Sequence, residues 1–316
     1  MLTDFKSAHH STYNCLEDVL ECLATGYKRA HLLMFAKAWD FNFFEKPLKG
    51  DTRLGTRVES GEYNAWESLK QYHGIGSKCV FTSNTNKQTE NLKRHLQSGN
   101  PVVLWLDGYY VPWTNIYKQL HMKHFIVAVG LKDEESIAVL DPYWNKKVNA
   151  LSWEAFKQSG AKCINITCLE EPNVVWQEVL SVQIEAIMSP SHNAFACMKH
   201  FAEAIKTLEL TRELKGFETL PYNCPLFMQL AEVFYKRLNY AKCLNYISEV
   251  YGVNKLGQYG EEMTQIGKGW QAAREQIVDV YKGKETPEIY EKVADYICHL
   301  AEEEAQLAQR ILILCE

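Results

Sequence analysis

The sequence contains no long apolar run and no excess of basic residues. A membrane-spanning helix needs about 20 predominantly apolar residues, and no segment of the 316-residue chain has that character, so we expect no membrane segment. Lysine and arginine total 34 against 39 aspartate and glutamate residues, which gives a formal net charge of −5. Nucleic-acid-binding proteins usually carry a basic patch or stripe. We therefore expect no nucleic-acid partner.

The ten cysteines include no Cys-x-x-Cys pair. That spacing is typical of structural zinc sites, so we predict no metal ligands. The first residues also lack the basic start and apolar run of a signal peptide. We therefore expect a cytoplasmic protein whose cysteines mostly stay reduced and pack as small buried hydrophobes.

Cys15 stands at the front of a strongly patterned segment. Apolar residues recur at helical spacing after it, and Gly26 can end the helix. Asn14 is a preferred N-cap residue, and Glu17 completes a capping box. Cys15 is then the first helical residue, where the helix dipole and unpaired N–H groups favour a thiolate. It is a candidate nucleophile, and the plain alternative is a buried structural thiol.

The character of the sequence changes after Glu170-Glu171-Pro172, because strands and helices mix before this point and helices dominate after it. We predict an α+β domain over residues 1–172 and a mostly helical domain over residues 185–316. The expected strands cover residues 77–82, 101–106, 124–130, 136–140, 147–148 and 162–169. The expected helices cover residues 15–26, 29–39, 62–72, 87–97, 152–158, 191–215, 225–238, 240–251, 260–281 and 287–316.

A predicted hairpin selects one histidine among ten. His124 opens an apolar strand, residues 132–135 form a turn, and the returning strand ends at Asp141. With the turn centred near residues 133 and 134, position 124 lies opposite about 143, close to Asp141. Asp141 can then orient His124, which would deprotonate Cys15 and later protonate the leaving group.

Each member of this arrangement also has a plain structural reading. Asp141, followed by proline, can be only a turn residue, and His124 can be only a hydrogen-bonded residue of a sheet. His121 precedes the strand and is the alternative base.

Five further residues are candidates for contact with a substrate. His9, His10 and Asn14 precede Cys15, and either histidine could donate to an oxyanion beside the Cys15 N–H. Exposed surface histidines are the alternative. Tyr109 and Tyr110 follow a buried strand, where they could line an acyl pocket or pack against other aromatic residues.

Three segments of the chain resemble a known family. They are His10-Ser11-Thr12-Tyr13-Asn14-Cys15, Asp107-Gly108-Tyr109-Tyr110-Val111-Pro112, and residues 124–130 with Val139-Leu140-Asp141-Pro142. Their order resembles papain-like enzymes of the bacteriocin-processing C39 type, and is more closely similar to the N-terminal domain of the butirosin biosynthesis protein H family. The resemblance implies a papain-like fold with Cys15 as nucleophile, His124 as base and Asp141 as orienting group.

One departure from the papain-like pattern concerns the oxyanion. Papain-like enzymes usually place a glutamine shortly before the cysteine as an oxyanion donor. His9 and His10 occupy that region here. The resemblance therefore does not identify the oxyanion donors.

The resemblance also implies an acyltransferase of antibiotic or nonribosomal peptide biosynthesis. Such an enzyme takes an acyl group from the phosphopantetheine thioester of an acyl or peptidyl carrier protein and passes it to a small-molecule amine. An internal nucleophile would give cyclisation instead. The phosphopantetheine arm arrives as substrate, no cofactor is expected to remain bound, and a homodimer is left open.

Two other functions are compatible with the same residues. A cysteine hydrolase, either a peptidase or a thioesterase, would use the same triad, and a non-catalytic interaction protein could keep a papain-like shell. The large helical region favours acyl transfer, because it gives room for a carrier protein and an acceptor.

Overall fold

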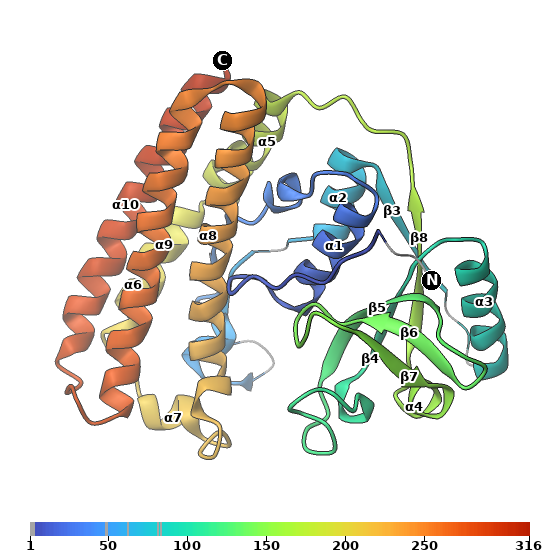
Figure 1. Cartoon of the computed structure of the whole chain (residues 1–316). Coiled ribbons are helices and arrows are strands. Elements are labelled where there is room, and N and C mark those ends of the chain that lie inside the picture. Colours follow the sequence, from blue (N-terminus) through green and yellow to red (C-terminus); the bar gives the residue numbers. More distant parts are fainter. Residues whose placement is uncertain (1–3, 48–49, 62, 81, 83) are drawn as a thin grey trace. The chain divides into compact units, whose positions relative to one another are not determined.

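The computed structural model describes residues 4–47, 50–61, 63–80, 82 and 84–316 (Figure 1). Contacts divide the chain into two compact units. The first contains Met1–Met34 and Ala65–Asn173, and the second contains Phe35–Asn64 and Val174–Glu316. The first unit mixes a sheet with helices and the second is mostly helical, so the predicted α+β class with a helical C-terminal part is confirmed. The papain-like character of the first unit remains a prediction.

Among the described residues of the first unit, six strands form one antiparallel sheet in the order β3-β8-β4-β5-β6-β7. The inner strands are rich in valine, leucine, isoleucine and alanine, which suits strands that are covered on both faces. The strands are β3 (Ile75–Val80), β4 (Val102–Asp107), β5 (Lys123–Leu131), β6 (Ser136–Leu140), β7 (Val148–Ser152) and β8 (Lys162–Cys168).

Helices of the first unit pack against this sheet. Helix α1 (Cys15–Gly26) lies against β5 and α2 (Ala65–His73), and α2 also lies against β3. Helix α3 (Thr85–Gln97) covers β5 and β8, and α4 (Trp153–Gln158) follows β7. The first unit also contains the 3₁₀ helix η4 (Gly108–Tyr110), and the 3₁₀ helix η1 (Leu32–Phe35) lies at its boundary with the second unit. The helices fix the positions of the strand ends that carry the candidate site.

The predicted caps of two helices are confirmed. The Asn14 side-chain oxygen accepts hydrogen bonds from Leu16 N and Glu17 N, at 2.9 and 3.0 Å, and the Glu17 carboxylate accepts from Asn14 N. The Ser152 hydroxyl accepts from Ala155 N at the start of α4. Capping of this kind stabilises a helix by about 1 kcal/mol and fixes its first residue. Cys15 is therefore held at the first position of α1.

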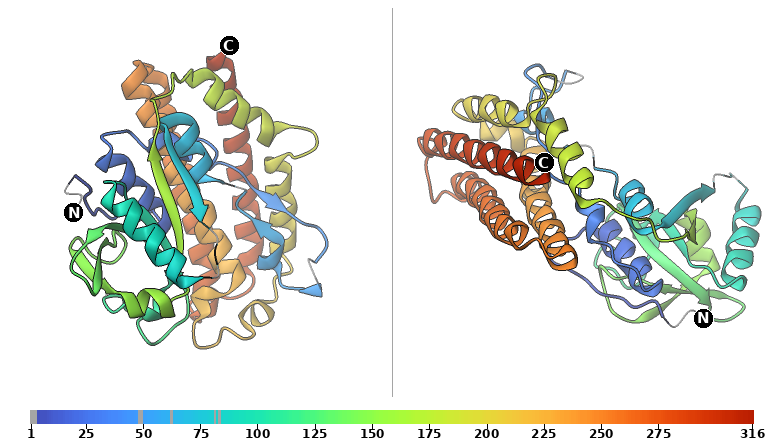
Figure 2. Two further views of the ribbon diagram at one scale, coloured as in Figure 1. Left: turned by 90° about the vertical axis from the view of Figure 1, so that its right-hand side faces the viewer. Right: turned by 90° about the horizontal axis from the view of Figure 1, so that it is seen from above.

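Long helices dominate the second unit (Figures 1 and 2). Helices α8 and α9 pack along each other, and α10 packs against α5, α6 and α9. They are α5 (Trp176–Met188), α6 (Ala194–Ile205), α7 (Leu210–Leu214), α8 (Pro225–Tyr251), α9 (Asn254–Tyr281) and α10 (Ile289–Cys315), with the 3₁₀ helix η5 (Pro221–Asn223) before α8. None of the helices in the described part of the chain is long and apolar enough to cross a membrane.

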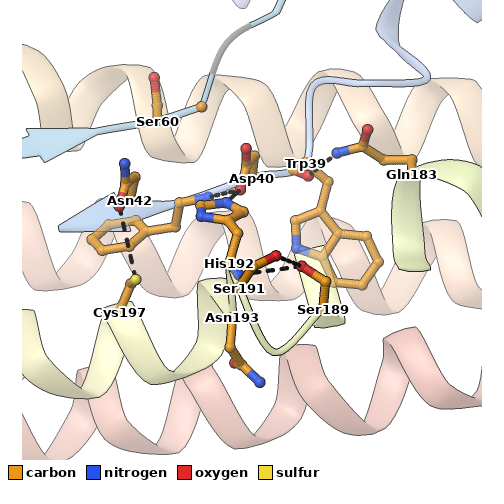
Figure 3. A network of polar contacts seen from close by, with 12 residues as sticks. Trp39, Asp40, Asn42, Ser60, Gln183, Ser189, Ser191, His192, Asn193 and Cys197 are labelled. Atoms are coloured by element: carbon orange, nitrogen blue, oxygen red, sulfur yellow. Dashed lines mark hydrogen bonds and ion pairs between the residues drawn. The ribbon is translucent and has the colours of Figure 1, made fainter. Parts of the chain in front are cut away.

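Residues 35–64 join the helical unit although they precede most of the sheet in sequence. They form the two-stranded ribbon β1 (Asn42–Phe43) and β2 (Val58–Glu59) and the 3₁₀ helix η3 (Leu54–Arg57). Figure 3 shows Gln183 Nε2 donating to the carbonyl of Trp39 and His192 Nε2 donating to Asp40 Oδ1, both at 2.7 Å. These bonds connect the segment to α5 and to the loop before α6.

A buried carboxylate strengthens this connection. Glu304 accepts hydrogen bonds from Trp39 Nε1 at 2.5 Å, from Trp270 Nε1 at 2.7 Å and from two nitrogens of Arg237 at 3.0 and 3.1 Å. Arg237 also donates to the Asp40 carbonyl at 2.6 Å. Because Glu304 and Arg237 are fully buried, removal of either partner would leave an uncompensated buried charge.

The grouping of residues 35–64 differs from the predicted domains. The sequence predicts one domain over residues 1–172 and a second over residues 185–316. These domain limits stay a prediction. The compact units place residues 35–64 with the helices instead. The physical reason is the hydrogen bonding of Trp39 and Asp40 to helical residues, which a sequence pattern does not reveal.

Several predicted helices were wrong in extent. Residues 29–39 contain only η1, because residues from Leu33 to Trp39 are almost all buried and have no polar face for a surface helix. Helix α5 was missed, residues 191–215 contain two helices, and residues 225–251 form a single helix. The predicted start of a helix at residue 62 and the predicted strand residue 81 lie outside the described residues.

Candidate active site

Cys15 lies at the first position of α1 and is partly exposed. The amides of Leu16 and Glu17 donate to the Asn14 side chain, and Asp18 N donates to the Asn14 carbonyl at 3.1 Å. Within the described residues, Cys15 N–H is thus the first-turn amide that has no recorded partner. The thiol and a free backbone donor are presented together at the positive end of the helix dipole.

His124, at the start of β5, lies beside this thiol. Its Nε2 donates to Asp141 Oδ2 at 2.9 Å, and its ring is hydrogen-bonded with Cys15. Because Asp141 occupies Nε2, Nδ1 is the ring nitrogen left to interact with the thiol. The side chain of His124 is 2% exposed and that of Asp141 is fully buried. The structure therefore brings Cys15, His124 and Asp141 together.

The pKa of His124 is set by its burial and by its two neighbours, Asp141 and Cys15. Burial lowers the pKa of His124, since it disfavours the charged ring, but the hydrogen bonds and charges of Asp141 and Cys15 outweigh burial. Together they raise the pKa of His124 to about 9. A ring of this basicity can accept the proton of a neighbouring thiol and hold it as an imidazolium.

Asp141 is fixed by more than His124. Its Oδ2 also accepts from Trp113 Nε1 at 2.7 Å, and its carbonyl accepts from Asn145 N at 3.0 Å. Asp141 therefore is a turn residue, as the plain reading held, and at the same time orients the imidazole. The sequence-based prediction did not include Trp113, although this residue directly follows the Asp107–Pro112 segment that contains the candidate residues Tyr109 and Tyr110.

The register of the hairpin is as predicted. Val127 pairs with Leu140 and Ala128 with Val139, and continuing this pairing puts position 124 opposite 143. A bulge between Ala128 and Gly130 shifts the register closer to the turn. The shift lies on the turn side of His124 and so does not disturb its approach to Asp141.

The histidines that precede Cys15 are held by α1. His9 Nδ1 donates to Asp18 Oδ2 at 2.6 Å, and His10 N donates to Asp18 Oδ1 at 3.2 Å. The His10 ring instead contacts Glu21, at 3.0 Å. Burial raises the pKa of Asp18, and the hydrogen bond from His9 partly opposes this. The sequence-based prediction did not include Asp18. Its position three residues after Cys15, on the same helix, was the feature that could have indicated a role near the thiol.

Two parts of the chain match families of known proteins. Residues 10–142 match the family described as butirosin biosynthesis protein H, N-terminal. This match supports a butirosin biosynthesis protein H-like N-terminal region. Residues 236–311 match a second family, described as Domain of unknown function (DUF4872). No curated protein matches the chain.

The butirosin H region contains Cys15, His124 and Asp141, and also the two tyrosines predicted to contact substrate. Tyr109 and Tyr110 form η4, where their rings contact each other and the ring of His121. Among the described residues, no recorded contact joins them to the Cys15–His124–Asp141 group. Their role in an acyl pocket remains a prediction.

Asn14 and His121, two further residues predicted to take part in the site, make structural hydrogen bonds. Asn14 caps α1 through its side-chain oxygen, which leaves only its amide nitrogen for a substrate. His121, the alternative base, is bound to Asp107 at 2.6 Å and its side chain is 66% exposed. The described residues include no group of three or more His, Cys, Asp or Glu side chains placed to hold a metal ion.

Proposed function

We propose that the protein is a cysteine acyltransferase of natural-product biosynthesis. The match to the butirosin H family supports a biosynthetic enzyme of that type. The observation that carries the chemistry is the thiol of Cys15, at a helix N-terminus, hydrogen-bonded to an imidazole that a buried Asp141 orients. A nucleophile, a base and an orienting carboxylate in this order suit acyl transfer.

The donor in this proposal is an acyl thioester on the phosphopantetheine arm of a carrier protein. The Cys15 thiolate attacks the carbonyl carbon, and the carbon–sulfur bond to the arm breaks. His124 gives its proton to the departing thiol. One thioester replaces another, so this step is nearly balanced in energy.

The acceptor is an amine, either a separate small molecule or a group on the acyl chain itself. The amine attacks the acyl group on Cys15, His124 takes the amine proton, and the Cys15 sulfur leaves. Water must be excluded for transfer to compete with hydrolysis. Asn14, Tyr109 and Tyr110 are the side chains that we propose contact the substrate.

Intact-protein mass spectrometry with acyl-pantetheine thioesters tests this function. We expect an acyl adduct that is absent in Cys15→Ala, forms slowly in His124→Ala, and is consumed faster when amines are added. An adduct that decays at the same rate with and without amines would identify a thioesterase. Failure of every thioester to acylate Cys15, together with cleavage of peptides, would identify a peptidase.

A further inference from the structure

A second histidine–aspartate pair lies beside the nucleophile. Asp18 is one helical turn after Cys15 on α1, and residues at this spacing have Cβ atoms roughly 5–6 Å apart on the same helix face. His9 Nδ1 is bound to Asp18 Oδ2 at 2.6 Å, so the helix that presents the thiol also holds His9.

His9 and His124 share an aromatic neighbour. The ring centroid of Tyr143 lies 5.0 Å from that of His9 and 6.3 Å from that of His124. The ring of His9 is therefore near the ring of the proposed base.

The hydrogen bonding of His9 leaves one nitrogen for a substrate. Nδ1 is occupied by Asp18, and within the described residues Nε2 has no recorded partner, on a side chain that is 38% exposed. His10 does not offer the same group, because its Nε2 is engaged by Glu21. The geometry therefore separates the two histidines that the sequence left equivalent.

We propose that His9 is an oxyanion donor, positioned by Asp18. This inference rests on the proposed acyl transfer. When the Cys15 sulfur bonds to the carbonyl carbon, the carbonyl π electrons move to oxygen, and His9 Nε2–H and Cys15 N–H donate to that oxygen. As the carbonyl re-forms, the bond to the leaving thiol breaks and His124 supplies the thiol's proton.

Asp18 acts through His9 and is a positioning residue. The buried Asp18 side chain fixes the His9 ring through Nδ1, which leaves Nε2 to donate to the oxyanion. The two histidines then have different roles, since His124 transfers a proton and His9 donates a hydrogen bond.

The test compares two reactions of Cys15, acylation by S-acetyl-pantetheine and alkylation by iodoacetamide, which forms no oxyanion. His9→Ala should slow acylation roughly 10²-fold and leave alkylation within about twofold. His9→Gln should recover much of the acylation rate, because its amide donates without a charge. His299→Ala is the matched control, since His299 pairs with Glu303 on α10 at 3.6 Å.

A double-mutant cycle separates the positioning role of Asp18 from a merely structural one. Asp18→Asn should slow acylation roughly tenfold with His9 present, and within about twofold in the His9→Gln background. An equal cost in both backgrounds, or a parallel loss of alkylation in His9→Ala, would overturn the proposal. If wild-type Cys15 accepts no thioester, the proposed function fails. The same variants assayed with p-nitrophenyl acetate still decide the role of His9.

Discussion

Two histidine–aspartate pairs at one end of the sheet have the same chemistry and different surroundings. His124 and Asp141 lie 2.9 Å apart, and His121 and Asp107 lie 2.6 Å apart. The side chains of the first pair are 2% and 0% exposed, against 66% and 21% for the second. Water screens an exposed pair strongly, so its strength falls to a fraction of that of a buried one. Distance alone therefore does not identify a catalytic pair.

The partners of the two pairs differ as well. His124 faces the Cys15 thiol, whereas the His121 ring stacks on Tyr109 with centroids 4.1 Å apart. Asp107 also accepts from the backbone amide of Tyr109, which organises η4. The buried pair adjoins the Cys15 thiol, and the exposed pair organises the η4 loop.

The largest expected difference between the two pairs is in the acylation rates of the variants that lack their histidines. His124→Ala should slow acylation of Cys15 by roughly 10³-fold, because the thiol loses its base. His121→Ala should change the rate by less than about threefold. Single-turnover acylation measured by mass spectrometry gives both rates. Comparable losses in the two variants would mean that the pairs do not differ in function.

The carboxylates give the next comparison. Asp141→Asn should slow acylation by roughly 10²- to 10³-fold, because the amide no longer stabilises the imidazolium or fixes the ring. Asp107→Asn should act mainly on the η4 loop and cost less than about threefold. Rates for both variants at saturating thioester test this, with thermal unfolding as the check on folding. A larger loss in Asp107→Asn would refute the ranking.

The pH dependence of stability should distinguish the buried pair. The folded-state pKa of His124 is raised to about 9, whereas an unfolded histidine titrates near about 6.5. Its contribution is therefore complete below pH ~6.5 and is lost as the pH rises through ~9, by at most about 3 kcal/mol. Denaturant unfolding between these limits should show this fall. In Cys15→Ala the fall should be smaller, because Cys15 helps to raise this pKa; an unchanged fall would contradict the coupling.

The smallest effect concerns Trp113, which has no counterpart at Asp107. Trp113→Phe keeps an aromatic ring but removes the donor to Asp141 Oδ2. We expect a loss of about 1 kcal/mol in unfolding free energy and a rate reduced by roughly three- to tenfold. Chemical denaturation and the acylation assay measure the two quantities. Full activity in this variant would show that Asp141 orients His124 without the hydrogen bond from Trp113.

The sequence was most informative where local rules decide the structure. The Asn14 capping box placed Cys15 at its helical position, and counting from the turn of the hairpin paired His124 with Asp141. Both depend on short-range geometry that residue spacing reveals. The roles of Trp113 and Asp18 depend on side chains that meet only after folding, so no spacing rule ranked them above their neighbours.

Long-range packing explains the remaining errors. The largely apolar segment around Trp39 gave a helical pattern, yet it is mostly buried and forms only a short 3₁₀ turn nearby. Periodicity does not separate a buried irregular segment from a buried helix. The contact between Trp39 and Glu304 provides information that no local window contains.

That contact also constrains how the protein can be made. Trp39 and Glu304 are 265 positions apart, and a ribosome that adds 5–20 residues per second needs roughly 13–53 s to connect them. During this interval Trp39 lacks the carboxylate that its indole nitrogen will bind. A chain that stops before α10 would keep this early segment without its final partner. Helix α10 therefore supplies, late in synthesis, the hydrogen-bond partner of a segment that is made much earlier.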